Sequence, residues 1–207
     1  GGGVAYSEAT QALRELVEAT GVPVAETQAG KGSLAWDDPL SVGAVGATGA
    51  TAANTLAAEA DLVIGIGTRW SDFTTASMSA FADPDVRFVN INVADLDGLK
   101  LSALSVVADA REALQALTTQ LQGWRTDSAY TLRAGELARA WDGEVAAAYD
   151  LEGDPGAAPR QSQVTGAVND LSVPRGVVRF AAGALPCARP QCGRPRDAKG
   201  RTGGCGT

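Results

Sequence analysis

The chain has 207 residues, of which 45% are hydrophobic and 20% charged, and its formal net charge is −7. This composition is typical of a globular domain with an appendage, and the acidic balance argues against a nucleic-acid partner. No apolar run approaches the roughly 20 residues that span a membrane, and the chain does not open like a secretory signal. Histidine is absent, so a Ser-His-Asp or Cys-His catalytic apparatus is not expected from this chain alone.

The three cysteines, Cys187, Cys192 and Cys205, all follow Pro186. A body without cysteine suits a reducing cytoplasm, and the cysteine spacing contains no CxxC pair of the kind that binds zinc. Residues 187–207 carry a net charge of +4 and contain no Leu, Ile, Val, Phe, Tyr or Trp. We therefore expect this tail to be disordered, and its composition favours a frame-shifted translation of GC-rich DNA over a natural tail.

The first expected elements surround two glycine-rich stretches. Three glycines at positions 1–3 are typical of a strand-to-helix turn. Ser7 is a suitable N-cap for a helix predicted over 9–20, which Gly21 would end. A strand follows over 22–26, and residues 29–49 are rich in Gly, Ser and Pro, which predicts a loop.

The clearest strand signal of the chain is a short apolar run within the segment ADLVIGIGTRWSDF. After a predicted helix over 51–60, the run over 61–66 is typical of a strand buried on both faces at the centre of a parallel sheet. Gly65 and Gly67 would let the backbone turn tightly at its carboxyl end. That end is where open α/β sheets bind ligands.

Strands alternating with helices continue along the chain and indicate an α/β class with a mostly parallel sheet. Residues 75–81 are expected to be irregular or a helical turn, and Asp109 is a predicted N-cap. The remaining expected elements are strands over 86–93, 105–107 and 176–181 and helices over 110–122, 127–150 and 162–171.

Glycines after the predicted strands could place backbone amides around an anion, or could serve only as tight turns of an α/β domain. The residues concerned are Gly30, Lys31, Gly32, Gly46 and Gly49. Arg69 could pair with a phosphate or carboxylate, and the alternative is an ion pair with Asp72 or another acid. Asn90 and Asn92 stand where dinucleotide binders usually place an acid for a ribose, which disfavours FAD or NAD.

Four sequence blocks occur in order: PVAETQAGKGSL, DDPLSVGAVGATG, ADLVIGIGTRWSDFTT and FVNINV. Together they resemble the central domain of the thiamine-diphosphate-dependent enzyme superfamily, which includes acetolactate synthase and pyruvate oxidase. The wording ETQAGKGSL and IGIGTRWSDFTTAS most resembles the trihydroxycyclohexane-1,2-dione hydrolases of myo-inositol catabolism. The resemblance spans about residues 1–186 and implies a Rossmann-like parallel sheet flanked by helices. It also implies that an apolar first strand, which normally precedes such glycines, is missing here.

The resemblance implies a division of the chain: 1–150 central domain, 151–160 linker, 161–186 start of the diphosphate-binding catalytic domain and 187–207 aberrant tail. Gly183, Ala184 and Leu185 resemble the loop that lies near the cofactor's diphosphate, although a tight turn after a strand is the plainer interpretation. The family's metal-binding GDG motif has no counterpart, since Asp154 falls in the linker. The family's activating glutamate lies in a domain upstream. No catalytic or metal-binding residue is therefore assigned.

The parent enzyme implied by the resemblance would use thiamine diphosphate and Mg²⁺ to hydrolyse a C–C bond. It would open the ring of trihydroxycyclohexane-1,2-dione to 5-deoxyglucuronate, as a cytoplasmic homo-oligomer without membrane or nucleic-acid partners. The isolated chain is expected to be inactive and to hold no cofactor tightly. The alternatives are a FAD- or nucleotide-binding module and a fragment of an acetolactate-synthase-like carboligase.

Overall fold

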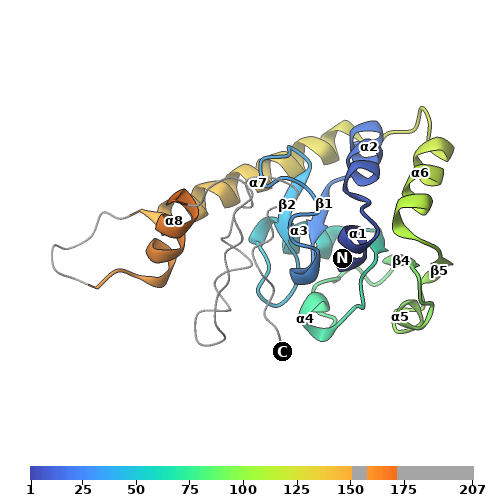
Figure 1. Ribbon diagram of the computed structural model, residues 1–207, viewed down its shortest axis with the longest axis horizontal. Helices are drawn as coiled ribbons and strands as arrows, with labels where there is room; N and C mark the ends of the chain where they lie inside the picture. The colour runs from blue at the N-terminus through green and yellow to red at the C-terminus, as the bar shows by residue number, and fades with distance from the viewer. Residues whose placement is uncertain (151–157, 172–207) are drawn as a thin grey trace.

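The computed structural model describes residues 1–150 and 158–171 of the chain. Helices and short parallel strands alternate along it (Figure 1). In chain order the elements are α1 Gly2–Tyr6, α2 Thr10–Thr20, β1 Val24–Glu26, η1 Gln28–Gly30, β2 Ser41–Ala44, α3 Thr51–Glu59, β3 Leu62–Ile66, α4 Asp72–Thr75, β4 Arg87–Asn92, α5 Leu96–Leu99, β5 Leu104–Val107, α6 Ala110–Gln120, α7 Ser128–Tyr149 and α8 Gln161–Leu171.

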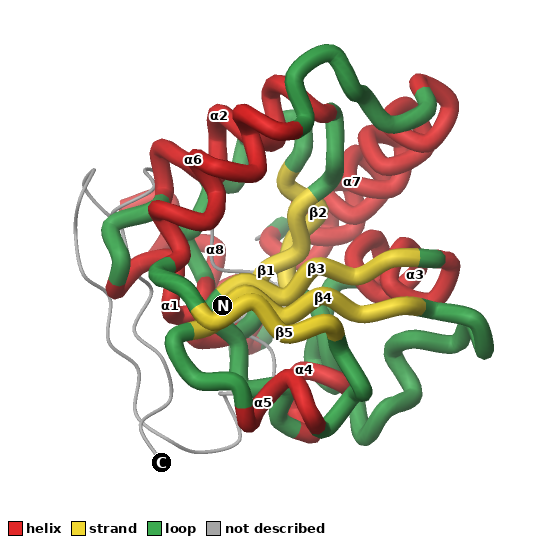
Figure 2. The backbone as a smooth tube through the Cα atoms, turned by 90° about the vertical axis from the view of Figure 1, so that its right-hand side faces the viewer, coloured by secondary structure: helices red, strands yellow, loops and turns green. Residues whose placement is uncertain are grey.

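The described strands form two parallel sheets. β1 pairs with β2, and β3, β4 and β5 form a three-stranded sheet with β4 in the middle. In this sheet Gly65 of β3, Asn90 of β4 and Ser105 of β5 are aligned as register partners. Because all strands of a sheet point the same way, their carboxyl ends lie at one edge, and the loops that follow the strands begin there (Figure 2).

Two apolar clusters hold the helices in place. The first joins α1, α2 and α6, with Leu34 from the loop after β1 inserted among them. The second joins β2 and α3 to the long helix α7, around Val42, Leu56 and Ala134. Figure 2 shows α2 and α6 on one side of the three-stranded sheet and the short helices α4 and α5 on the other.

The amino end of the chain lies at the carboxyl end of β3. The Gly1 amino nitrogen donates to the Ile66 carbonyl at 2.8 Å, and the Gly3 amide donates to the Gly67 carbonyl at 3.0 Å. Burial lowers the pKa of the Gly1 amino group to about 6, although the charge of Glu26 opposes this shift. Helix α1 therefore begins at the same edge as the strand loops.

Most predicted elements are confirmed within a few residues, and Asp109 does cap α6 by accepting from the Arg111 amide at 2.9 Å. The predicted loop over 29–49 is wrong in part, because it contains β2 and η1. The strand β2 is missed because a run of four residues, one of them Gly43, has little β-strand character of its own and forms by pairing with β1.

The placement of β3 at the sheet centre, buried on both faces, is also wrong. β3 is a terminal strand of the described three-stranded sheet, and β4 holds the middle position. Leu62 and Ile64 are 44% and 36% exposed. A short apolar run predicts a hydrophobic strand. The tertiary arrangement decides which elements pack against that strand and how far they bury it.

Ser7 is not the N-cap of α2, which begins after Ala9. The Ser7 hydroxyl instead donates to Asp109, and this bond is the main reason that the pKa of that carboxyl is lowered. The predicted helix over 162–171 is confirmed as α8. The predicted strand over 176–181 and the segment 187–207 lie outside the described residues.

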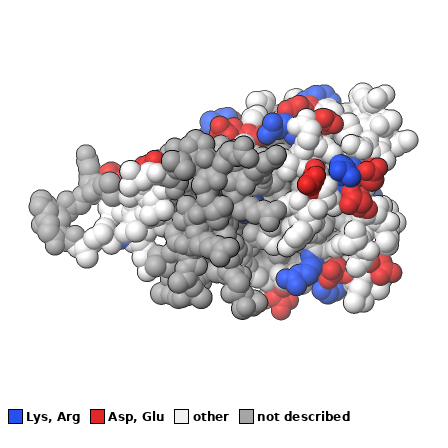
Figure 3. Space-filling view, in the orientation of Figure 1, with Lys and Arg blue, Asp and Glu red and all other residues white. Residues whose placement is uncertain are grey.

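Figure 3 shows acidic and basic side chains intermixed on the described part of this face, without a broad patch of one sign. Within residues 1–150 and 158–171, no helix has both the length and the apolar character needed to cross a membrane.

Candidate functional site at the carboxyl ends of the strands

The loop after β1 folds around a carboxylate of its own chain. Glu26, the last residue of β1, is 6% exposed and accepts from the Leu34 amide at 3.2 Å. Burial raises the pKa of Glu26, and the charge of Lys31 and the amides of Leu34, Ser33 and Gly32 oppose that shift. The Ser33 amide donates to the Gly30 carbonyl at 3.0 Å, so the amides of Ser33 and Leu34 both have acceptors within the protein.

The loop after β2 is likewise hydrogen-bonded within itself. Asn54 of α3 accepts from the Gly46 amide at 2.9 Å and donates to the Gly46 carbonyl at 3.0 Å. The Gly49 amide donates to the Gly46 carbonyl and the Ala50 amide to the Ala44 carbonyl, at 2.8 and 2.6 Å. Because these donors already have protein acceptors, the loop before α3 acts as a closed turn rather than an open anion site.

The loop after β3 is held down by side chains from β4 and from the segment following α5. The Asn92 amide donates to the Thr68 carbonyl, and Lys100 donates to the Arg69 carbonyl, both at 3.0 Å. The Trp70 indole N–H donates to Asn90 at 2.9 Å. Trp70 has a left-handed φ of 51°, and its indole lies directly against Gly65 of β3.

The side chain of Arg69 is exposed, and within the described residues no ion pair is found for it. The predicted alternative of a salt bridge with Asp72 is therefore wrong in this structure. The backbone of Arg69 is held by Lys100, while its side chain is exposed to solvent. Its role as an anion-binding residue stays a prediction.

Asn90 and Asn92 are structural residues in this arrangement. Asn90 is fully buried beside Gly98, and its side chain orients Trp70. Its amide nitrogen and the Ser105 hydroxyl are both buried, and neither has a hydrogen-bond partner among the described residues. Trp70 also stacks edge-on with Phe81 and Phe88, at centroid distances of 6.1 and 5.6 Å. At the positions where dinucleotide binders usually place an acid for a ribose, both side chains thus bond to the loop after β3.

Two features of this edge escaped sequence reasoning. Glu26 stands in the quoted block ETQAGKGSL, and an acidic residue ending an apolar strand beside a glycine loop was the available signal. The pairing of Trp70 with Asn90 had no such signal, because the two residues are 20 positions apart. The predicted cofactor contacts Gly183, Ala184 and Leu185 lie outside the described residues. In the part of the chain that the structure describes, no group of three potential metal ligands comes together.

Parallel strands, flanking helices and glycine loops gathered at one edge define an α/β domain of Rossmann-like type. The chain belongs to the family described as thiamine pyrophosphate enzyme, central domain, whose profile matches residues 1–117. This match confirms the resemblance that the four sequence blocks indicated, and it ends before α7.

Several similar proteins are trihydroxycyclohexane-1,2-dione hydrolases. The chain is 46% identical over 151 residues to 3D-(3,5/4)-trihydroxycyclohexane-1,2-dione hydrolase 2 of Bacillus cereus, with 73% of this chain and 23% of that protein covered. It is 40% identical over 208 aligned positions to hydrolases of the same name in another Bacillus cereus strain and in Bacillus anthracis, with 90% of this chain and 32% of those proteins covered. The chain thus spans about a quarter to a third of the length of the curated relatives it matches.

Proposed function

We propose that this chain supplies the central domain of a thiamine-diphosphate-dependent hydrolase that opens the ring of trihydroxycyclohexane-1,2-dione to 5-deoxyglucuronate. The observation that carries the proposal is the 46% identity over 151 residues to a hydrolase of that name. The family assignment alone covers enzymes of several activities, so the substrate rests on this closer similarity.

The role proposed for the domain is that of a scaffold. The amides of the loops after β1 and β2 are directed at Glu26 and at protein carbonyls and Asn54, so these two loops do not fit a diphosphate group. No step of the reaction is therefore placed on the described residues. When bound elsewhere in the parent enzyme, thiamine diphosphate supplies the electron sink for C–C cleavage.

The finer assignments belong to the same proposal. Mg²⁺ as the partner of the diphosphate, a homo-oligomeric parent and a cytoplasmic location follow from the resemblance to the hydrolases. The division into 1–150, 151–160, 161–186 and 187–207 is proposed on the same ground, and so is a contact of Gly183, Ala184 and Leu185 with the cofactor. Support for the first segment is that α7 packs on α3 and β2 well beyond the family match.

A domain exchange tests the proposal. Residues 1–150 of this chain would replace the corresponding segment of the Bacillus cereus relative, and turnover of the dione would be measured with thiamine diphosphate and Mg²⁺. We expect activity within about tenfold of the parent, a loss of no more than roughly 1.4 kcal/mol in transition-state stabilisation. The unaltered chain by itself is expected to give no turnover above the uncatalysed rate.

The control is the same exchange made with the central domain of an acetolactate synthase. It is expected to fold and to lose dione hydrolysis, because its surface has not adapted to the other domains of this enzyme. A hybrid carrying this chain's segment that binds the cofactor but carboligates pyruvate instead of opening the dione would overturn the proposal.

A further inference from the structure

The outer edge of β5 is an unpaired strand edge at the end of the three-stranded sheet. β5 bonds to β4 on one side, and among the described residues no hydrogen bond joins its other side to another segment. At the opposite end of this sheet, the amino end of the chain bonds to the last residues of β3. The backbone amides and carbonyls along the outer edge of β5 can therefore pair with a further strand.

Apolar side chains that are open to solvent surround this edge. Leu104 and Val107 of β5 are 68% and 61% exposed, and α5, which lies beside β5, carries two exposed leucines one turn apart. Together with Val93, which follows β4, they make up a surface named here the β5 face: Val93, Leu96, Leu99, Leu104, Val106 and Val107. A surface of several exposed apolar side chains marks an interaction site.

The edge lacks the features that usually keep an exposed strand from pairing. Monomeric proteins protect such edges with a lysine, a proline or a β-bulge. Residues 101–108 contain no charged residue and no proline, and the register between β4 and β5 runs without a shift. Because the chain carries a net charge of −7, two copies repel each other least where the surface is uncharged. The edge is therefore suited to the same edge of a second copy.

The position of β5 in the molecule also favours a second copy. α8, the last described helix, lies at the opposite end of the molecule from β5 (Figure 1). The chain therefore continues from a point far from the β5 face. A second copy, by contrast, brings an identical unpaired edge, and a two-fold axis lets each edge satisfy the other.

We propose that two copies of this chain associate through the β5 face, with their β5 strands paired antiparallel about a two-fold axis. The two three-stranded sheets then form one sheet of six strands, and the leucines of α5 widen the contact beyond the short strands. This inference assigns a surface to the homo-oligomeric state proposed for the parent enzyme. Its test measures mass rather than turnover, so its failure can be told from a failure of the proposed reaction.

The first test is the mass of the purified chain, measured by analytical ultracentrifugation over a range of chain concentrations with a reducing agent present. We expect a reversible equilibrium between monomer and dimer. Leu104→Lys should raise the dissociation constant at least about tenfold, because it places two like charges in one short strand pair.

The matched control is Leu132→Lys on α7, where the leucine is 67% exposed against 68% for Leu104. It makes the same change of charge outside the β5 face. The dissociation constant should stay within about twofold of that of the unaltered chain, since a distant charge acts only through screened repulsion.

The second test is backbone amide hydrogen exchange in the unaltered chain, which covers the case in which Leu104→Lys does not fold. Amides on the outer edge of β5 should exchange more slowly as the chain concentration rises, whereas those of α7 should not change. Three results would overturn the proposal: a chain that stays monomeric, equal effects of the two lysine variants, or a dimer in which exchange in β5 is unaltered. The first of these would assign the β5 face to another domain of the parent enzyme.

Discussion

Gly67 turns the chain at the carboxyl end of β3 with a φ of +57°, and a β-carbon there would collide with the backbone of Gly3. Gly67→Ala should therefore cost at least about 3 kcal/mol of unfolding free energy, from strain and overpacking together. The matched control is Gly123→Ala, where φ is +80° and nothing lies within 4 Å. It should cost only about 1–2 kcal/mol, the strain alone.

Urea denaturation of both variants measures this difference, and Arg69→Ala provides a second reference. The Arg69 side chain is exposed, so its removal should change stability by less than about 0.5 kcal/mol. Equal costs for the two glycine variants would mean that the amino-terminal segment does not pack against Gly67.

In a purified chain that begins at Gly1, the amino group of this residue predicts a pH dependence of the folding stability. Its pKa falls from 8.0 to about 6 on folding, because burial disfavours the charged form. Between these values the unfolded chain binds more protons than the folded one, so stability should rise from pH 6 to pH 8. The total gain is about 1–3 kcal/mol, observable as a rising thermal midpoint.

A chain with apolar residues added before Gly1 is the control for this pH dependence. Gly1 then has an uncharged amide, which can still donate to the Ile66 carbonyl, and the rise between pH 6 and pH 8 should disappear. A slope that persists in the extended chain would have to come from another group. Glu26 is not that group, because its raised pKa makes stability fall as the pH rises.

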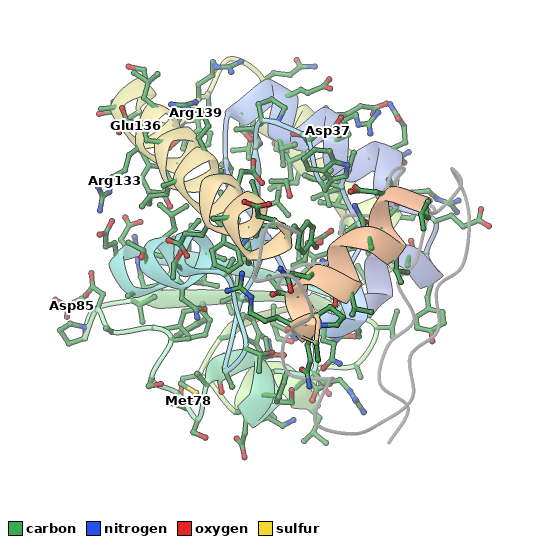
Figure 4. The ribbon with its side chains drawn as sticks, turned by 90° about the vertical axis from the view of Figure 1, so that its left-hand side faces the viewer. Asp37, Met78, Asp85, Arg133, Glu136 and Arg139 are labelled. Atoms are coloured by element: carbon green, nitrogen blue, oxygen red, sulfur yellow. The ribbon has the colours of Figure 1, made fainter. Side chains whose placement is uncertain are left out.

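At the scale of the elements, α7 is joined to α3 by one ion pair and one apolar seam. Arg133 bonds both oxygens of Glu59, at 3.0 and 2.6 Å, and lowers the pKa of that carboxyl. Figure 4 labels Arg133, Glu136 and Arg139 along α7. The neighbouring Ala134 is fully buried in the seam.

Burial should decide which of these contacts matters. Both partners of the ion pair are about half exposed, so Arg133→Ala should cost less than about 1 kcal/mol, and less again in high salt. Ala134→Leu should cost about 1–3 kcal/mol by overpacking the seam. Thermal unfolding at low and high salt compares them, and a larger loss for Arg133→Ala would show that the ion pair holds α7.

At the scale of the whole molecule, the strand loops are closed by internal contacts. We expect no saturable binding of FAD to the purified chain, because the amides after β1 and β2 are already bonded and Asn90 is committed to Trp70. Flavin fluorescence on titration is the measurement, with an acetolactate synthase as the positive control. Stoichiometric flavin binding would favour the nucleotide-binding alternative.

Local signals in the sequence were sufficient for the α/β class, for most helices and for the family. The hydrophobic pattern of α2, the Asp109 cap and the strand run before Gly67 each depend on residues close together in the chain. The four ordered blocks identified the family because their spacing reflects the order of strands and loops.

Only the tertiary structure decided which strands are neighbours and what the glycine loops contain. β3 is a terminal strand rather than the centre, and β2 exists because β1 lies beside it. In the glycine loop after β1, the Leu34 amide donates to Glu26 and the Ser33 amide to the Gly30 carbonyl, and Asn90 accepts from Trp70 in the loop after β3. The physical reason is the same in each case. The role of a backbone amide, and the formation of a short strand, depend on the group that bonds to it. When folding brings that group from a distant part of the chain, the local sequence does not reveal it.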